Sequence, residues 1–453
     1  MSAPRLLLVP THRTALADAV AAALAELFIA RGQQVRYHHL GPVGPAACWD
    51  RWEGSSFLDA GLYSEEALLG LYEAATRGAE LSLLSTDWGV LDNPPDAAWT
   101  PATIARLLDC PVLLAVDCRE WRNGLRLLAA GFRTHLDTIN LAGVLLTGVA
   151  DQQQLDLIRP IFAGQDVPIV GCLFAGDGPE WGAAAPGAWG LPLDPDMLDA
   201  VARQVDLRGV VTLAGQRGFL PSQNQLTDRS GGGPLVMVAG GKGFGLWSRD
   251  SIEVLRATGA QVRRLDLLED AVLPHDAAGL VLAGTTWPSA LADIAMNTSL
   301  LDSITKGVRA GLPTLALGGG ALLLLDKVQD LLGRTSDLAG VVPAEAEILW
   351  ELNEPVRMDV TALRDNLLLA QGESVPAWLF TDAETTDMRD PGDRAEPALR
   401  IGTGDTAGGF DGLAGDSLVC TTALIHLSAR PGLASRFVRR CSDYASRRFD
   451  NRR

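Results

Sequence analysis

Residues 5–32, RLLLVPTHRTALADAVAAALAELFIARG, give the clearest indication of the fold class. Its opening segment, Arg5–Pro10, is a short apolar run that predicts a buried strand. The following segment, Ala15–Ala30, has helical periodicity and is rich in alanine and leucine, and Gly32 closes it. A strand that leads through a short connection into a helix is the repeating unit of α/β proteins.

The same alternation of apolar runs and helical segments continues through the first half of the chain. Continuous apolar runs separated by helices are typical of a parallel sheet covered by helices on both faces. Further strands are predicted at Glu80–Ser85, Pro111–Val116, Leu141–Thr147 and Pro168–Leu173, and helices at Thr100–Leu108 and Asn123–His135.

A polar segment rich in glycine and proline then interrupts the pattern. Residues 216–234, QRGFLPSQNQLTDRSGGGP, have no periodicity and are interpreted as a domain linker. We therefore expect two α/β domains, residues 1–215 and 235–453, each a mainly parallel sheet covered by helices. In the second, strands are predicted at Leu235–Ala239, Gln261–Leu265, Ala278–Leu282, Thr314–Leu317 and Leu418–Leu427, and helices at Ser248–Thr258 and Leu300–Ala310.

The composition limits the classes of partner. The chain of 453 residues has a formal net charge of -17, which argues against a protein that binds nucleic acid by neutralising phosphates. Its six cysteines have neither metal-like nor paired spacing, so no zinc site or disulfide scaffold is expected. No apolar run is long enough to span a bilayer and the start lacks a signal-peptide pattern, so we expect a cytoplasmic protein.

Segments spread over nearly the whole chain resemble the cobyrinic acid a,c-diamide synthase family. They are, in order, RLLLVPTHRT, VRYHHLGP, DWGVLDN, CPVLLAVDCREWRNGLRLLAAGFRT, INLAGVLLTGV, LVLAGTTWP, GLPTLALGGGALLLL and ALIHLSARPGLASRFV. The resemblance implies a P-loop NTPase-like domain that binds ATP, followed by a class I glutamine amidotransferase-like domain.

The phosphate-binding loop of that family is altered in this chain. In the family the first strand leads into a glycine-rich loop ending in Gly-Lys-Thr/Ser, which holds the phosphates and Mg²⁺. Here the strand continues into Thr11, His12 and Arg13, without the glycines or the lysine, and the first 241 residues contain no lysine. These three residues remain candidates for binding a ligand.

Acidic residues of the nucleotide site are only partly retained. The segment that matches the family pattern Glu-Gly-x-x-Gly-Leu-x-Asp-Gly has Ser85 at the position of the Glu. Asp87, two residues later, and Asp92 are candidate ligand-binding residues. Asp117 ends an apolar strand, where it is either a ligand or a cap of the next helix.

The amidotransferase site lacks the groups that its chemistry needs. The resemblance implies a catalytic cysteine on a tight strand-to-helix turn and a distant histidine that accepts its proton. The nucleophile position is Gly318, and the position of the first histidine is Leu424. His426 matches a second histidine of the family pattern and is a further ligand candidate, although a lone histidine in an apolar strand is commonly a core residue.

These departures favour a non-catalytic relative that needs no cofactor or metal. It would bind a partner protein, or a tetrapyrrole-like or nucleotide-like ligand, through the clefts at the carboxyl ends of the strands. The alternative is an active ATP-dependent amidase of cobyrinate or a related tetrapyrrole, with a nucleotide site built without the loop lysine. A third hypothesis is a regulatory subunit that pairs with an intact homologue or forms a homo-oligomer.

Overall fold

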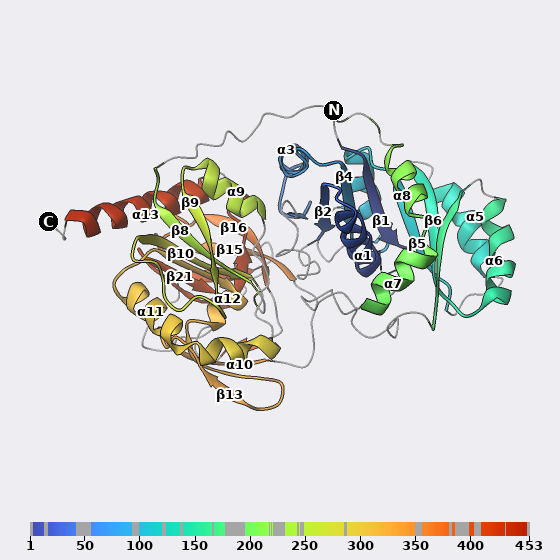
Figure 1. The fold of residues 1–453 in the computed structure, drawn as a ribbon. Helices are drawn as coiled ribbons and strands as arrows, with labels where there is room; N and C mark the ends of the chain where they lie inside the picture. Colours follow the sequence, from blue (N-terminus) through green and yellow to red (C-terminus); the bar gives the residue numbers. More distant parts are fainter. Residues whose placement is uncertain are drawn as a thin grey trace. The chain divides into compact units, whose positions relative to one another are not determined.

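A computed structural model of the chain contains two compact units, Met1–Gln225 and Leu226–Arg453 (Figure 1). The boundary falls inside the predicted linker, residues 216–234, most of which lies outside the described residues, so the linker stays a prediction. The structure describes residues 3–12, 17–41, 56–92, 99–119, 124–135, 139–164, 167–176, 195–216, 218, 220, 232–241, 244, 249–284, 288–348, 356–379, 383–385, 398–402, 409–430 and 432–450.

A seven-stranded parallel sheet forms the first unit, in the order β3-β2-β4-β1-β5-β6-β7. The central strand β1 is buried along its whole length, because helices cover the sheet on both faces. The predicted parallel α/β architecture is confirmed. The strands are β1 (Arg5–Pro10), β2 (Val35–Leu40), β3 (Ser56–Leu58), β4 (Leu81–Ser85), β5 (Val112–Asp117), β6 (Leu141–Val149) and β7 (Ile169–Phe174).

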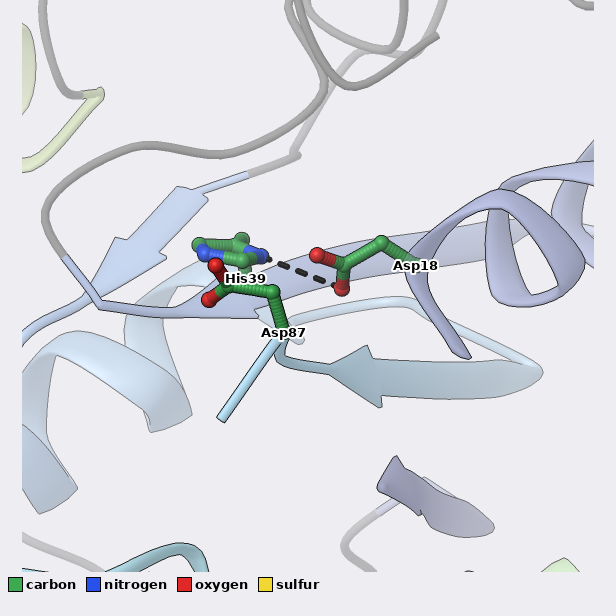
Figure 2. Close-up of side chains that lie close together, drawn as sticks. All are labelled: Asp18, His39 and Asp87. Carbon is green, nitrogen blue, oxygen red and sulfur yellow. Dashed lines mark ion pairs between the residues drawn. The ribbon is translucent and has the colours of Figure 1, made fainter. Parts of the chain in front are cut away.

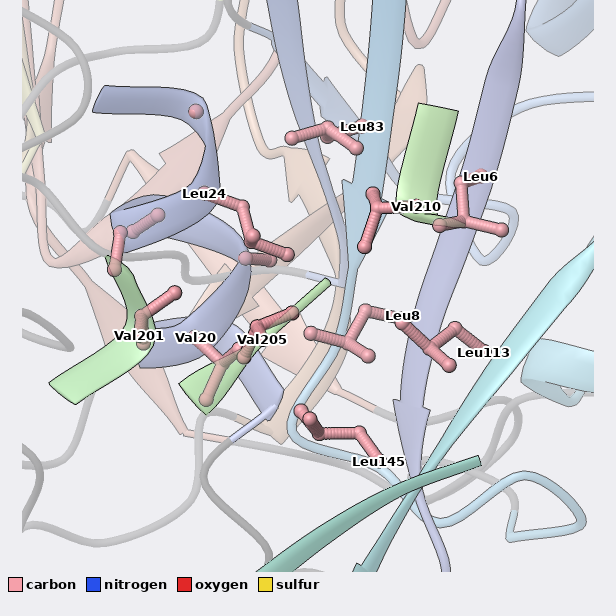
Figure 3. Close-up of a cluster of buried hydrophobic side chains, with 14 of the residues drawn as sticks. Leu6, Leu8, Val20, Leu24, Leu83, Leu113, Leu145, Val201, Val205 and Val210 are labelled. Atoms are coloured by element: carbon pink, nitrogen blue, oxygen red, sulfur yellow. The ribbon is translucent and has the colours of Figure 1, made fainter. Parts of the chain in front are cut away.

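One face of this sheet packs against α1, α7 and α8 (Figure 3). Leu6 and Leu8 are two residues apart on β1 and therefore point to the same face, where they join the cluster that contains Val20 and Leu24 of α1. The described helices of the unit are α1 (Ala17–Ala30), α3 (Glu65–Ala75), α4 (Pro101–Leu107), α5 (Leu125–His135), α6 (Gln152–Ala163), α7 (Pro195–Gln204) and α8 (Leu207–Ala214).

The second unit is built around a six-stranded sheet in the order β20-β21-β11-β10-β8-β9. Its strands are parallel except for β20, which is antiparallel to β21. The strands are β8 (Leu235–Gly240), β9 (Gln261–Asp266), β10 (Ala277–Gly284), β11 (Thr314–Gly318), β20 (Leu413–Ala414) and β21 (Leu418–Thr421). The described helices are α9 (Arg249–Ala257), α10 (Pro288–Met296), α11 (Thr298–Arg309), α12 (Gly319–Leu322) and α13 (Leu433–Asp450).

Two further sheets in this unit were not predicted. One has the order β13-β12-β14-β17, and the other, β19-β18-β15-β16-β22, is antiparallel throughout. Their strands are β12 (Leu325–Gln329), β13 (Thr335–Asp337), β14 (Val342–Ile348), β15 (Val356–Ala362), β16 (Ser374–Leu379), β17 (Ala383–Thr385), β18 (Leu399–Gly402), β19 (Phe410–Asp411) and β22 (Ala423–Ile425).

The single strand predicted at Leu418–Leu427 is wrong, because the chain changes sheets within it. Residues up to Thr421 pair with β11, and residues from Ala423 pair with β16. At the break, the backbone N–H of Thr422 donates to a carboxylate oxygen of Asp411 at 2.9 Å, and that of Ala423 donates to the Thr421 hydroxyl at 3.1 Å. These two backbone N–H groups therefore donate to side chains, whereas in a continuous strand they would donate to carbonyl oxygens of a neighbouring strand.

Among the described residues, no helix combines the length and the apolar character needed to cross a bilayer.

Candidate functional site

The carboxyl ends of β1, β2, β4 and β5 open on one edge of the first sheet, where α/β proteins bind their ligands. Thr11 follows β1, and its backbone N–H donates to the carbonyl oxygen of Ala115 at 3.0 Å, which extends the pairing of β1 with β5. His12 is exposed, and its Nδ1 lies 3.0 Å from the Thr11 hydroxyl oxygen. Arg13 lies outside the described residues.

A buried histidine lies between two aspartates at this edge (Figure 2). Asp18 is in the first turn of α1, His39 is near the end of β2, and Asp87 follows β4. The Nδ1 atom of His39 lies 3.3 Å from Oδ1 of Asp18, and the His39 side chain is 1% exposed. One oxygen or nitrogen from each of the three side chains lies within 4.8 Å of the other two, so together they could hold a metal ion.

The charge around His39 decides its protonation. Burial by itself lowers the pKa of His39, because desolvation penalises the imidazolium. The carboxylates of Asp18, Asp87 and Asp59 act in the opposite direction, and Asp18, whose Oδ1 lies 3.3 Å from the ring nitrogen, has the largest effect of the three. Together they raise the pKa of His39 above its ordinary value of 6.5. These carboxylates therefore give this edge of the sheet a negative electrostatic potential, which favours a positively charged side chain or ligand.

Ser85 connects Asp18 to a buried tyrosine. Its hydroxyl donates to the Asp18 carboxylate, which as an ionised group only accepts hydrogen bonds. The Tyr37 hydroxyl lies 2.6 Å from the same Ser85 oxygen and donates to it, since the single Ser85 proton is already used. This chain of hydrogen bonds fixes the orientation of the Asp18 carboxylate beside His39.

Asp117 is held by its own neighbour. The Nε of Arg119 lies 3.0 Å from each carboxylate oxygen of Asp117, and the Arg119 backbone N–H donates to Oδ1 at 3.0 Å. Asp117 is only 8% exposed. These contacts stabilise the turn after β5, which is neither of the two roles that the sequence left open, and the ligand role of Asp117 stays a prediction.

Asp92 is exposed at the end of a tight turn after β4. Its backbone N–H donates to the carbonyl oxygen of Gly89 at 2.8 Å. A Cβ atom added at Gly89 would clash with the Asp92 carboxylate and would lie 3.0 Å from the carbonyl oxygen of Thr11. Glycine at this position therefore lets the turn pack closely against the end of β1.

In the second unit, Gly318 lies on a sharp turn between β11 and α12, with φ 61 and ψ -133. A strand-to-helix turn of this kind is where hydrolases present a nucleophile. A Cβ atom added at Gly318 would lie 2.9 Å from the carbonyl oxygen of Gly284 and 3.5 Å from the Cβ of Leu424. The structure thus brings together the two positions that the resemblance assigned to the nucleophile and its base, and neither offers a thiol or an imidazole.

His426 is 2% exposed and lies just after β22. Its Nδ1 is 3.9 Å from Oδ2 of Asp250, in the first turn of α9, and the Ser428 hydroxyl donates to the same oxygen. The backbone N–H of Leu427 donates to the Ser251 hydroxyl at 3.0 Å. These buried contacts attach the end of β22 to the start of α9, and a ligand role of His426 stays a prediction.

Sequence reasoning found Asp87 but missed Asp18 and His39. Asp18 is the acidic residue in the first turn of α1, a position where aspartate commonly serves only the helix dipole. His39 stands in a strand that is buried along most of its length, where histidine is commonly a core residue. The pairing of strand ends that unites them is not visible in the sequence.

Comparison with known proteins shows relatives along almost the whole chain. No protein-family model matches the sequence. A hydrogenobyrinate a,c-diamide synthase of Mycobacterium tuberculosis is 27% identical over 372 residues, which cover 74% of this chain and 79% of that protein. A cobyrinate a,c-diamide synthase of Dehalococcoides mccartyi is 22% identical over 470 residues, covering 98% of this chain and 100% of that protein. Among solved structures, PurLQS from Thermotoga maritima aligns with 48% of this chain and 99% of that chain, at 14% identity and a TM-score of 0.33, a likeness too weak to support an inference.

The first prediction concerns the protonation of His39. In the presence of a chelator, an NMR titration should place its pKa above 6.5, and Asp18→Asn should lower this pKa by removing a negative charge. Because the pKa is higher in the folded than in the unfolded state, protonation stabilises the fold fully below pH of about 6.5, and this stabilisation is lost as the pH rises through the raised pKa. His275→Gln, at a side chain 81% exposed, is the control and should leave the His39 titration unchanged. A His39 pKa below 6.5 would contradict the geometry.

The second prediction concerns the turn at Gly318. Gly318→Ala should destabilise the second unit, by about 1–3 kcal/mol for the backbone conformation alone, with the contact to the Gly284 carbonyl oxygen adding to it. Gly311→Ala is the matched control, because Gly311 has φ +83 but no atom within 4 Å of an added Cβ. Thermal unfolding should rank Gly318→Ala as the less stable variant, and equal midpoints would show that the turn accepts a side chain.

Proposed function

We propose that this chain, which belongs to the cobyrinic acid a,c-diamide synthase family, is a non-catalytic member that acts in binding or assembly. The observation that carries the proposal is the position of Gly318 against Leu424, within 3.5 Å for an added Cβ. Glutamine hydrolysis by this class of site requires a thiolate on the turn and a base beside it. A glycine facing a leucine supplies neither group.

The charge at the other site supports the loss of ATP chemistry. A phosphate-binding loop attracts triphosphate with a helix N-terminus and a lysine. Here Asp18 places a carboxylate in the first turn of α1, and the first 241 residues contain no lysine. A triphosphate at this edge would meet the negative charges of Asp18 and Asp87, which repel it.

The binding role that we propose uses the edge at the carboxyl ends of the strands. Both units retain buried cores, so the scaffold persists where the catalytic groups are absent. The candidates for the bound species are a partner protein or a tetrapyrrole-like or nucleotide-like ligand. The relatives are named hydrogenobyrinate and cobyrinate a,c-diamide synthases, which supports the tetrapyrrole-like candidate. For a nucleotide-like ligand, the negative edge disfavours a triphosphate.

A glutaminase assay tests the second unit. The purified protein should release no glutamate above a buffer control, and Gly318→Cys should not restore release, because Leu424 offers no base. In the double variant Gly318→Cys, Leu424→His, the introduced thiol and imidazole would be adjacent. Iodoacetamide should therefore alkylate the thiol of the double variant faster than the thiol of the Gly318→Cys single variant. Glutamate release by the wild-type protein that His426→Ala abolishes would show a working enzyme and overturn the proposal.

Calorimetric titration with ATP·Mg²⁺ tests the first unit. We expect no saturation at concentrations up to about 1 mM, which corresponds to a binding free energy weaker than about -4 kcal/mol. Asp87→Asn should bind ATP·Mg²⁺ no more weakly than the wild-type protein, since it removes a repulsive charge. Saturable micromolar binding by the wild-type protein would contradict the proposal.

A further inference from the structure

Three segments that are distant in sequence bring Asp18, His39 and Asp87 together. They come from the first turn of α1, the end of β2 and the turn after β4. In Figure 2 the carboxylates of both aspartates lie beside the imidazole ring of His39. The arrangement combines one buried nitrogen ligand with two oxygen ligands, a donor set typical of metal sites rather than of an acidic surface.

We propose that Asp18, His39 and Asp87 bind one divalent first-row transition-metal ion, such as Zn²⁺ or Mn²⁺. This site does not involve the amidotransferase turn, but it uses Asp18 and Asp87, the residues whose charge we propose disfavours a triphosphate in the absence of a bound cation.

The distances suit such an ion. Ligand atoms about 2.0 Å from a tetrahedral Zn²⁺ lie about 3.3 Å from each other. The Nδ1 of His39 and Oδ1 of Asp18 are separated by 3.3 Å. The Asp87 ligand atom lies within 4.8 Å of the other two, a gap that rotation about the bonds of its partly exposed side chain can close.

The charges suit it as well. Two carboxylates balance the two positive charges of the ion. The imidazole of His39, once the ion displaces the proton from its coordinating nitrogen, adds the nitrogen ligand that distinguishes transition metals from Mg²⁺ or Ca²⁺. Asp59 is buried, and its carboxylate also acts on His39 through its charge. Asp59 therefore adds to the negative potential that attracts a cation.

Hydrogen bonds from residues next to the ligands also support a metal site. Metal-binding carboxylates are usually oriented by hydrogen bonds from neighbouring residues. The Ser85 hydroxyl donates to Asp18 and is itself 2.6 Å from the Tyr37 hydroxyl, so the carboxylate is held before any ion arrives. Three protein ligands leave a coordination position for water or for an oxygen of a bound ligand.

The test measures metal binding by the full chain after removal of metals with a chelator. Titration with ZnCl₂, followed by elemental analysis after desalting, should give one ion per chain. Asp87→Asn and His39→Gln should each weaken binding at least tenfold, because the first removes the negative charge of a ligand oxygen and the second removes the nitrogen ligand. His275→Gln is the matched control, since His275 also lies near an aspartate, 4.0 Å from Asp276, but is 81% exposed. Wild-type binding that these two ligand variants leave unchanged would assign the ion to another site and overturn the proposal.

A second measurement guards against ligand variants that fail to fold. Mn²⁺ added to the wild-type protein should lose its free-ion EPR signal at one equivalent, and Zn²⁺ should restore that signal by competition. Mg²⁺ should compete at least tenfold less well, because it prefers oxygen ligands. Failure of the wild-type protein to bind either Zn²⁺ or Mn²⁺ would overturn the proposal without any variant.

Discussion

The register between β2 and β4 is the constraint on which the first site depends. In this parallel pair His39 lies opposite Ser85, so their side chains share one face of the sheet. Ser85 in turn donates to Asp18, which brings the start of α1 to the same point. A slip of one residue would turn His39 to the opposite face and separate it from both aspartates. The apolar residues that bury these strands therefore also determine the geometry of the polar group at their ends.

The two units depart from the family's sequence pattern in different physical ways. At Gly318 the side chain is missing but the backbone turn remains, and glycine adopts its positive φ without the strain that a cysteine would bear. At the edge near Asp18, the side chains have the opposite charge to those of a phosphate-binding site. A phosphate site attracts anions with lysine and a helix N-terminus, whereas here carboxylates at the same edge attract cations. The loss of glutamine hydrolysis that we propose therefore comes from a missing side chain, and the loss of ATP binding that we propose comes from a reversed local charge.

The fold could be predicted where burial is uniform. Apolar runs such as 111–116 are buried on both faces of a parallel sheet, so the run itself locates the strand. The two additional sheets of the second unit were missed although β14, Val342–Ile348, alternates strictly between buried and exposed residues, a signal with a period of two. The pairing of Asp18 with His39 could not be predicted, because it depends on strand register, and each residue has an ordinary role when taken alone. The proximity of Gly318 and Leu424 followed from the resemblance rather than from any local pattern.

The energetics of burial separate the cluster around His39 from ordinary core residues. Burying ionisable groups costs desolvation free energy, and replacing a buried ion pair with apolar residues is often neutral or stabilising. Stability alone therefore does not explain the contact between His39 and Asp18 at the edge of the sheet. Nor does it explain why Ser85 and Tyr37 orient the Asp18 carboxylate by hydrogen bonds. A bound cation offsets that cost, because it neutralises both carboxylates at once and uses the imidazole nitrogen. The desolvation cost and the geometry together favour a binding role for this edge over a purely structural one.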